Sequence, residues 1–515
     1  MDMKRFLLGT MAFMALSISS VYAVGLDYYQ TLVTEQQASA AGQSHVFGLN
    51  YYADGSLLVL ANYQTDTTAG DGVMVFCGKT YGAALGNRKG NGGSRYKLKN
   101  YRNALLSKLD NKGEIVWAVV DSTFDFDLSA SAAMTTENGG AIWAQKGKDA
   151  EGRFWTYINV YSNTGQFIDG GYVMADYEQK SFMTQVPKDS YAWTGLVQDA
   201  EGNTYLAGYQ AGDLIPRANS DTVRARTQEW NGEGNQKSKY ANTVILKYDK
   251  NMFFAGATSY IEGLKYDRPS GIHYEDGKLY VAGVYNNATD SGLYAARYNT
   301  NLELEDIQYH PVTGSVKLEQ TKFVDGRIYI CGGLGKNGSV TVGDKTITTE
   351  PTINNSGFVF IINQTDGQAL DVAVKKDMFG LTVAAYPEED GVVAYYYGPM
   401  GKSMALHYDA DMNLVSADTL ATGGGLSIVT CVARKVDGRQ TAVGFRAKSD
   451  SEYDLLGIKM QPENTNWYSV VAFLSENGTM GFEQVKSEDG KAVKFIENGQ
   501  LFIRYNGRKY NILGY

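Results

Sequence analysis

The sequence predicts an all-β protein, and three observations support this prediction. The 515-residue chain contains 58 glycines, 37 tyrosines and only 8 prolines, a composition that favours many turns and many aromatic strand positions. Asp-Gly and Asn-Gly pairs, which adopt positive φ at little cost, recur between apolar stretches as they do in tight hairpins. Beyond the amino-terminal segment, no helical periodicity of useful length appears.

Charge and composition exclude several classes of protein. Lys and Arg number 47 against 56 Asp and Glu, which gives a net charge of −9, while hydrophobic residues make up 43% and charged residues 20%. This is the composition of a folded, soluble protein rather than a disordered or membrane-embedded one. The acidic balance argues against a nucleic-acid partner. We therefore expect a folded protein without a transmembrane segment and without affinity for nucleic acid.

Residues 1–23 have the organisation of a secretory signal peptide. Lys4 and Arg5 form the charged start, residues 6–17 the apolar core, and residues 21–23 a cleavage site of the small-x-small kind. The apolar run is too short to span a bilayer comfortably, and no cysteine near the cleavage site indicates a lipid anchor. The sequence therefore predicts an exported protein whose mature chain begins at residue 24.

The cysteines predict no disulfide framework. Cys77, Cys331 and Cys431 are odd in number and widely spaced, although a single bridge would be possible. Cys331 and Cys431 lie in apolar, strand-like runs. We expect both to be buried thiols without a redox role.

A repeat of two paired hairpins organises the chain after the signal peptide. The first hairpin of each repeat turns at Asp54-Gly55, Asn138-Gly139, Glu201-Gly202, Asp276-Gly277, Asp325-Gly326, Asp390-Gly391 and Asp437-Gly438. The second hairpin carries an apolar residue, a cation, an aromatic or apolar residue and then Asp or Asn before its turn, as in Leu246-Lys247-Tyr248-Asp249 and Ala296-Arg297-Tyr298-Asn299. The spacing from one repeat to the next is nearly constant, whereas the spacing between the two hairpins varies widely.

A constant part with one elastic loop is typical of four-stranded units that carry loop insertions. Seven such repeats predict a seven-bladed β-propeller over residues 24–486, followed by a β-hairpin tail at residues 487–515. An alternative is an eighth blade that opens near Asn498-Gly499 and is closed by an amino-terminal strand at residues 29–34.

Two parts of the chain resemble known families. Residues 197–209, and more loosely residues 276–299, resemble the D-x-x-G-N-x-Y-x-x-G repeat of bacterial β-propellers. That resemblance implies the fold and carries no catalytic residues. Residues 494–514 resemble a short tail found on exported proteins of Bacteroidota, although the long basic-ended sorting domain of the type IX route is missing. The resemblance implies a Gram-negative source and a place in the periplasm, on the outer surface or outside the cell.

The elastic loops predict where the binding surface lies. The loop between the second and third strands of a blade emerges on the same face as the blade-to-blade connection, and function on such scaffolds generally resides in loops. Four long insertions, at residues 64–103, 210–242, 334–357 and 446–467, therefore share one face with a long connection at residues 174–190. The candidate binding residues in these insertions are Arg88, Arg95, Tyr96, Arg224, Arg226, Trp230, Tyr453 and Trp467.

The sequence predicts no catalytic residues, cofactor or metal. The cation-rich residues 86–97 lack the spacing of a phosphate-binding loop, and a G-x-S-x-G nucleophile elbow is missing. The run that begins at Asp409 lacks the Gly and Glu of a calcium loop, since Leu414 and Leu420 occupy those places. None of the four histidines has zinc-site spacing, and His407 stands where other repeats carry Lys or Arg.

These observations favour a secreted or cell-surface protein that binds a protein or glycan without performing chemistry. The alternative is a carbohydrate-active hydrolase or lyase, which rests only on the activities that propeller folds host elsewhere. The oligomeric state stays open at this point.

Overall fold

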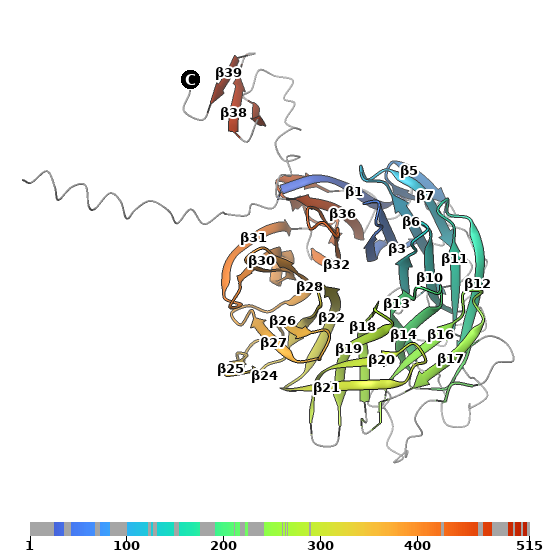
Figure 1. The fold of residues 1–515 in the computed structure, drawn as a ribbon. Coiled ribbons are helices and arrows are strands. Elements are labelled where there is room, and N and C mark those ends of the chain that lie inside the picture. Colours follow the sequence, from blue (N-terminus) through green and yellow to red (C-terminus); the bar gives the residue numbers. More distant parts are fainter. Residues whose placement is uncertain are drawn as a thin grey trace, which may run out of the picture.

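The protein is a ring of β-sheets that surround a common centre (Figure 1). In the described part of the chain, all regular secondary structure is β-strand apart from one 3-10 helix at Pro399–Gly401, which confirms the predicted all-β class. The sheets have the arrangement of a β-propeller. The computed structural model describes residues 25–35, 43–66, 73–82, 100–121, 125–126, 131–148, 154–175, 191–210, 212–216, 222–224, 241–259, 261–262, 264, 266–287, 290–423, 427–461, 467–475, 493–497, 500–505 and 508–511.

Antiparallel pairing of strands that follow one another in the chain recurs through these ranges, and we call each group of strands paired in this way a unit. Unit 1 contains β2 (Gln43–Tyr51), β3 (Leu57–Asp66), β6 (Asn100–Leu109) and β7 (Ile115–Asp121). Unit 2 contains β8 (Asp125–Phe126) and β9 (Ala132–Thr135), which pair with different segments of β10 (Ala141–Lys148), then β11 (Phe154–Tyr161) and β12 (Phe167–Ala175). Unit 3 contains β13 (Tyr191–Gln198), β14 (Thr204–Gln210), β16 (Asn242–Tyr248) and β17 (Phe254–Ser259).

The second half of the ring continues in the same way. Unit 4 contains β18 (Tyr266–Glu275), β19 (Lys278–Asn286), β20 (Ser291–Asn299) and β21 (Leu304–Thr313). Unit 5 contains β22 (Val316–Val324), β23 (Arg327–Leu334), β26 (Ser356–Asn363) and β27 (Ala369–Val374). Unit 6 contains β28 (Leu381–Glu388), β29 (Gly391–Tyr397), β30 (Ser403–Asp409) and β31 (Leu414–Gly423).

The amino-terminal strand completes the last unit and so closes the ring. Unit 7 contains β32 (Ile428–Arg434), β33 (Thr441–Lys448), β36 (Trp467–Ser475) and, as its outer strand, β1 (Gly25–Glu35). The tail strands β37 (Val493–Glu497), β38 (Gln500–Tyr505) and β39 (Arg508–Asn511) pair with one another in a separate sheet. The eight-blade alternative required the amino-terminal strand to pair with the tail, but this strand pairs with β36.

Repeated Asp and Asn residues form turns between the first and second strands and between the third and fourth strands of a unit. Asp199 and Asp249 show the geometry at a first and a second turn: Oδ1 accepts the backbone N–H groups two and four residues further on, at 2.8–3.0 Å. A short polar side chain that satisfies two turn donors explains why the motif recurs. The predicted turn glycines fit this geometry, with φ +87° at Gly202, but the sixth repeat differs: its turn is formed by Glu389 and Asp390, and Gly391 already belongs to β29.

The first strand of a unit bulges where it passes the second. In unit 4 the register shifts between Pro269 and Gly271, and this shift brings the Arg268 carbonyl towards Gly283 on β19. A Cβ at Gly283 would lie 2.0 Å from that oxygen, so only glycine fits. The same requirement explains the Ala-Gly and Cys-Gly pairs two or three residues before the end of the second strands of units 3, 4 and 5.

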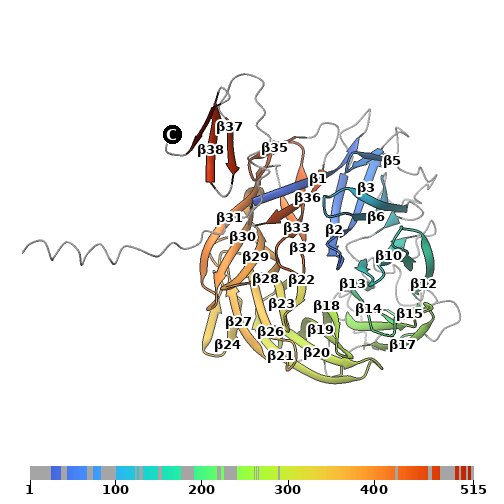
Figure 2. The same cartoon turned by 45° about the horizontal axis from the view of Figure 1, so that its top comes forward.

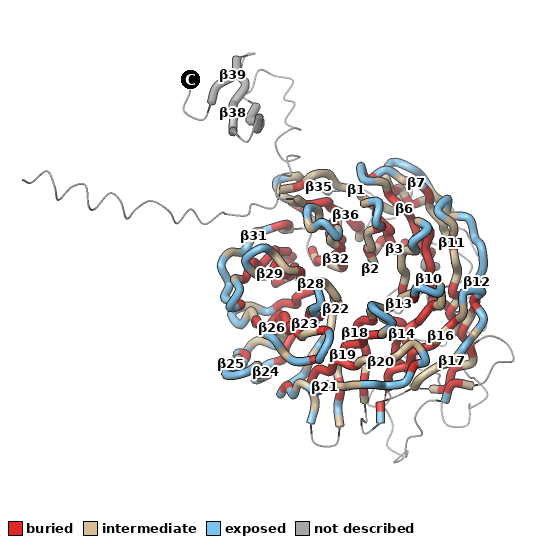
Figure 3. Tube along the Cα trace, in the orientation of Figure 1, coloured by how far each residue is buried: buried red, intermediate tan, exposed pale blue. Residues whose placement is uncertain are grey.

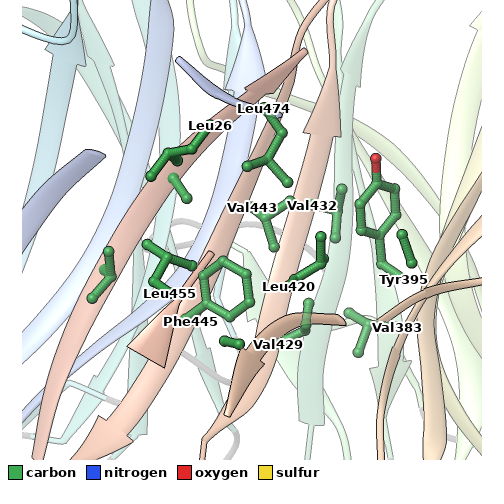
Figure 4. Close-up of a cluster of buried hydrophobic side chains, with 14 of the residues drawn as sticks. Leu26, Val383, Tyr395, Leu420, Val429, Val432, Val443, Phe445, Leu455 and Leu474 are labelled. Carbon is green, nitrogen blue, oxygen red and sulfur yellow. The ribbon is translucent and has the colours of Figure 1, made fainter. Parts of the chain in front are cut away.

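Apolar side chains fill the space between neighbouring units. Figure 3 shows buried residues along inner and middle strands such as β14, all of whose residues are buried. Figure 4 shows one of these clusters, in which Val383 and Tyr395 of unit 6 meet Val443, Phe445 and other side chains of unit 7. Cys331 and Cys431 are fully buried free thiols, as predicted, and burial raises the pKa of Cys431 to about 12.

Candidate functional site: the insertion face

Each long insertion contributes one or two extra strands that pair with the outer strand of the preceding unit. These added strands are β4 (Val73–Phe76) and β5 (Lys79–Gly82), β15 (Leu214–Pro216), β24 (Ser339–Val342) and β25 (Lys345–Thr348), and β34 (Tyr453–Leu455) and β35 (Ile458–Met460). β4 pairs with β1, β15 with β12, β24 with β21 and β34 with β31. Figure 2 shows β15 beside β12.

All four insertions attach at the same end of the units. The paired residues are the last ones of each outer strand, for example Val173–Ala175 on β12 and Ala421–Gly423 on β31. An outer strand ends on the side where the chain crosses to the next unit, and the second-to-third strand connection lies on that side too. We call this side the insertion face and the opposite side, with the two hairpin turns of each unit, the turn face.

Tyr453 is not available to a partner, which corrects the prediction for this residue. Its exposed fraction is 0%, and its ring packs edge-on against Tyr468 with 6.1 Å between centroids. The added strand β34 alternates its side chains, so Tyr453 and Leu455 enter the core between units 6 and 7. The sequence placed this segment in the long insertion at residues 446–467 and predicted a surface loop, whereas backbone pairing with β31 turns one of its sides inward.

Arg224 lies at the surface of the third unit's insertion. Its side chain is 70% exposed, and Nη1 is 2.7 Å from Oδ2 of Asp213, whose side chain is 7% exposed. Gln210 Nε2 donates to the Arg224 carbonyl at 3.1 Å, and Val223 bridges back to Leu214. Arg224 is therefore held by its own insertion while its guanidinium faces solvent.

Trp467 is the first residue of β36, lies on the insertion face and is partly exposed. The Arg446 guanidinium lies 4.5 Å from the Trp467 ring centroid, and Arg446 Nη2 donates to Gln43 Oε1 at 3.0 Å. The stack lies within unit 7, and the hydrogen bond to Gln43 joins it to unit 1 where the ring closes. The other predicted binding residues, Arg88, Arg95, Tyr96, Arg226 and Trp230, lie outside the described residues.

A second arginine–aromatic stack, which the sequence did not predict, lies between units 3 and 4. The Arg268 guanidinium is 3.9 Å from the Tyr209 ring centroid, and Nη1 donates to the Tyr266 hydroxyl at 3.3 Å. Tyr209 packs with Ala192 and Ala241, and Tyr266 covers this group, which we call the Tyr209 cluster. Among the described residues, no carboxylate lies within ion-pairing distance of Arg268. Its motif, Tyr266-Asp267-Arg268-Pro269, has no recurrent pattern that could have marked it.

Asp267, next in sequence to Arg268, serves the framework. Its carboxylate accepts bonds from Asn242 Nδ2 at 2.6 Å and from the Thr243 backbone N–H at 2.8 Å, and it is fully buried. Burial raises the pKa of Asp267, although these hydrogen bonds oppose the shift. The carboxylate is thus committed to unit 3 and does not neutralise Arg268.

On the turn face, the repeated cations join neighbouring units. Lys247 Nζ donates to the Thr300 carbonyl at 2.9 Å, and Arg297 Nη1 donates to the Thr365 carbonyl at 2.7 Å, each in a turn of the next unit. His407 fills the same position in unit 6 but contacts its own unit, with Nδ1 2.9 Å from Glu388 and Nε2 3.3 Å from Asp418. These contacts explain the cation motif as structural.

Near the centre, units 5 and 7 meet directly. Lys322 Nζ and the Tyr386 hydroxyl both donate to the Val432 carbonyl, at 2.7 and 3.0 Å, and Gln320 Oε1 accepts the Val432 N–H at 3.2 Å. Burial lowers the pKa of Lys322 to about 8. The inner strand of unit 6, β28, is buried from Leu381 to Tyr386 behind this bridge.

Two features are absent from the described part of the chain. No group of three or more His, Cys, Asp or Glu side chains there could hold a metal ion. None of the helices in those ranges has the length and apolar character needed to cross a membrane.

Comparison with known proteins gives similarity of structure only. No protein-family model and no curated protein sequence matches the chain. The Dos1 propeller is similar with 8% identity and a TM-score of 0.44, over 89% of this chain and 96% of that one. A cobalt-substituted apocarotenoid oxygenase of Synechocystis is similar with 9% identity and a TM-score of 0.35, over 78% of this chain and 95% of that one. At such values neither likeness supports a function.

Proposed function

We propose that this chain is an exported, seven-bladed β-propeller that binds a protein or glycan through its insertion face without performing chemistry. The seven units would be the blades, with β1 supplying the outer strand of the last one. Residues 1–23 would be removed on export from a Gram-negative cytoplasm, and residues 487–515 would form a tail beyond the ring. The expected location is the periplasm, the outer surface or the medium.

The observation that carries this proposal is the anchoring of the insertions. Because added strands pair with the sheet at one end of the units, residues 83–99 and 225–240 each follow a stem that the fold holds in place. Binding loops on rigid stems cost less entropy to order than free loops. Residues 83–99 also contain five cations and no Asp or Glu in a chain of net charge −9, which suits an acidic partner.

The proposal is tested by deleting residues 86–96 and, separately, residues 225–235. Both deletions leave the described strands intact, so the melting temperature should change little. Binding to immobilised glycans and polysaccharides should weaken at least tenfold in one of the two variants. The matched control is Lys112→Gln, which removes an exposed cation from the turn face.

Two outcomes would contradict the proposal. Binding that survives both deletions but is lost in Lys112→Gln would place the working surface on the turn face. Release of reducing ends from any polysaccharide in the panel would show a hydrolase or lyase instead of a binding protein.

A further inference from the structure

We propose that Arg268 is the anion-binding residue of the insertion face and receives the carboxylate or sulfate group of an acidic saccharide. This inference rests on the proposed function, because it names the chemical class of ligand for the same face. The two possible groups share one chemistry: an oxyanion that accepts parallel N–H bonds from a planar guanidinium.

The first argument is the unmatched charge of Arg268. Arg297 on β20 of the same unit lies 3.3 Å from a carboxylate oxygen of Glu305 and also donates to a carbonyl. Arg268 has a tyrosine ring beneath it and a tyrosine hydroxyl beside it, and no carboxylate of the described residues reaches it. A guanidinium held in this way has N–H donors left for a ligand.

The second argument is that the guanidinium is oriented in advance. The Tyr209 ring, 3.9 Å from the guanidinium carbon, restricts the positions that the fork can take, and Tyr209 itself packs with Ala192 and Ala241. The hydroxyl of Tyr266 fixes one Nη atom. Less side-chain entropy is then lost when an anion binds.

The third argument concerns position and the choice of a saccharide. β18 is the inner strand of unit 4, and Arg268 is its third residue from the insertion face. Arg268 therefore lies close to the insertion-face end of an inner strand. The partly exposed side chain of Tyr266 lies beside the guanidinium, so an apolar sugar face can rest on its ring while the acidic group meets Arg268.

The test measures binding of the full chain by titration calorimetry to polygalacturonate, to chondroitin sulfate and to neutral dextran. We expect at least one acidic polymer to bind and dextran to bind at least tenfold more weakly, with affinity falling as salt rises. Binding of polygalacturonate alone would identify a site for carboxylates. Tighter binding of chondroitin sulfate than of polygalacturonate would identify a site that accepts sulfate. Arg268→Gln should weaken binding at least tenfold, and Arg268→Lys should restore only part of it because the fork is lost.

The control is Arg439→Gln, which makes the same change of charge at an exposed position of the turn face. Equal losses in Arg268→Gln and Arg439→Gln would overturn the inference, as would binding of dextran or of poly-glutamate in preference to both acidic polysaccharides. Weakened binding in the loop deletions with no effect of Arg268→Gln would refute this inference alone. Unchanged binding in both deletions would refute the proposed function instead, and circular dichroism would verify the fold of every variant.

Discussion

The turn face and the insertion face are two ends of the same units, and they are built by different means. On the turn face, Asp or Asn side chains stabilise successive turns in the same way. Asp249, Asn299 and Asp409 each accept hydrogen bonds from two backbone N–H groups of their turn at 2.7–3.0 Å. On the insertion face the connections range from the short turn of Asn287 to Asp290 to insertions with strands of their own. Local side-chain chemistry organises one face, and long-range backbone pairing organises the other.

The difference has a consequence for where function can reside. A turn that depends on an Asp or Asn side chain accepts few other residues at that position. An added strand that pairs through its backbone needs only alternating apolar residues, so its sequence and the loop beyond it can vary freely. Pairing also covers the ends of the outer strands of units 2, 4, 6 and 7, which would otherwise expose unpaired backbone groups.

The largest expected effect tests whether the added strands belong to the core. Tyr453→Ala should lower the free energy of unfolding by about 3–4 kcal/mol, because a fully buried aromatic ring would leave a cavity between units 6 and 7. Urea denaturation followed by circular dichroism measures this change.

The matched control for Tyr453 is Phe167→Ala on β12, where the side chain is 61% exposed. This change should alter the free energy of unfolding by about 0.5 kcal/mol or less. Similar losses in the two variants would mean that the hairpin of β34 and β35 is not docked, and Tyr453 would again be a candidate for partner contact.

A smaller effect tests the side-chain mechanism of the turn face. Asp199→Ala should cost about 2 kcal/mol of folding free energy, since it removes the acceptor for Glu201 N, Asn203 N and the Tyr205 hydroxyl. Asp199→Asn keeps one side-chain oxygen and should cost clearly less. If both substitutions cost the same in urea denaturation, charge rather than acceptor geometry would stabilise the turn.

The turn face could be predicted from the sequence because its chemistry is local. Asp249, Asn299 and Gly202 each act within a few residues of their own position, so their spacing reveals the repeat. The insertion strands could not be predicted in this way. The turn of the first added hairpin is formed by Cys77 and Gly78, at φ +50° and +70°, and no Asp-Gly or Asn-Gly pair marks it.

The candidate site was predictable only in part, for a related reason. The insertion face follows from loop lengths, but the partners of its side chains lie on other units. Arg268 is a candidate binding residue because it stacks on Tyr209, which belongs to the preceding unit. Tyr453 is buried only because β34 pairs with β31. Sequence patterns reveal interactions between residues close together in the chain, whereas both of these contacts join neighbouring units.

The smallest expected effect concerns pH and His407, the histidine in the cation position of the turn face. Burial alone would lower the pKa of His407, but the hydrogen bond and charge of Glu388 and the charge of Asp418 outweigh it and raise the pKa above 6.5. A pKa that is higher in the folded state means that protonated His407 stabilises the fold. This contribution is complete below the unfolded pKa and disappears as the pH rises through the folded pKa.

Replacement of His407 should therefore be most harmful in mild acid. The melting temperature of His407→Gln should lie furthest below that of the unaltered protein near pH 5.5, and the difference should shrink towards pH 8. His407→Lys places a permanent cation there, like Lys247 in unit 3. The melting temperature of this variant relative to the unaltered protein should be at least as high at pH 8 as at pH 5.5. Thermal melts by circular dichroism across this range measure both variants. A deficit of His407→Gln that grew with pH would show that the neutral imidazole stabilises unit 6, and the cation position would then not be equivalent across the ring.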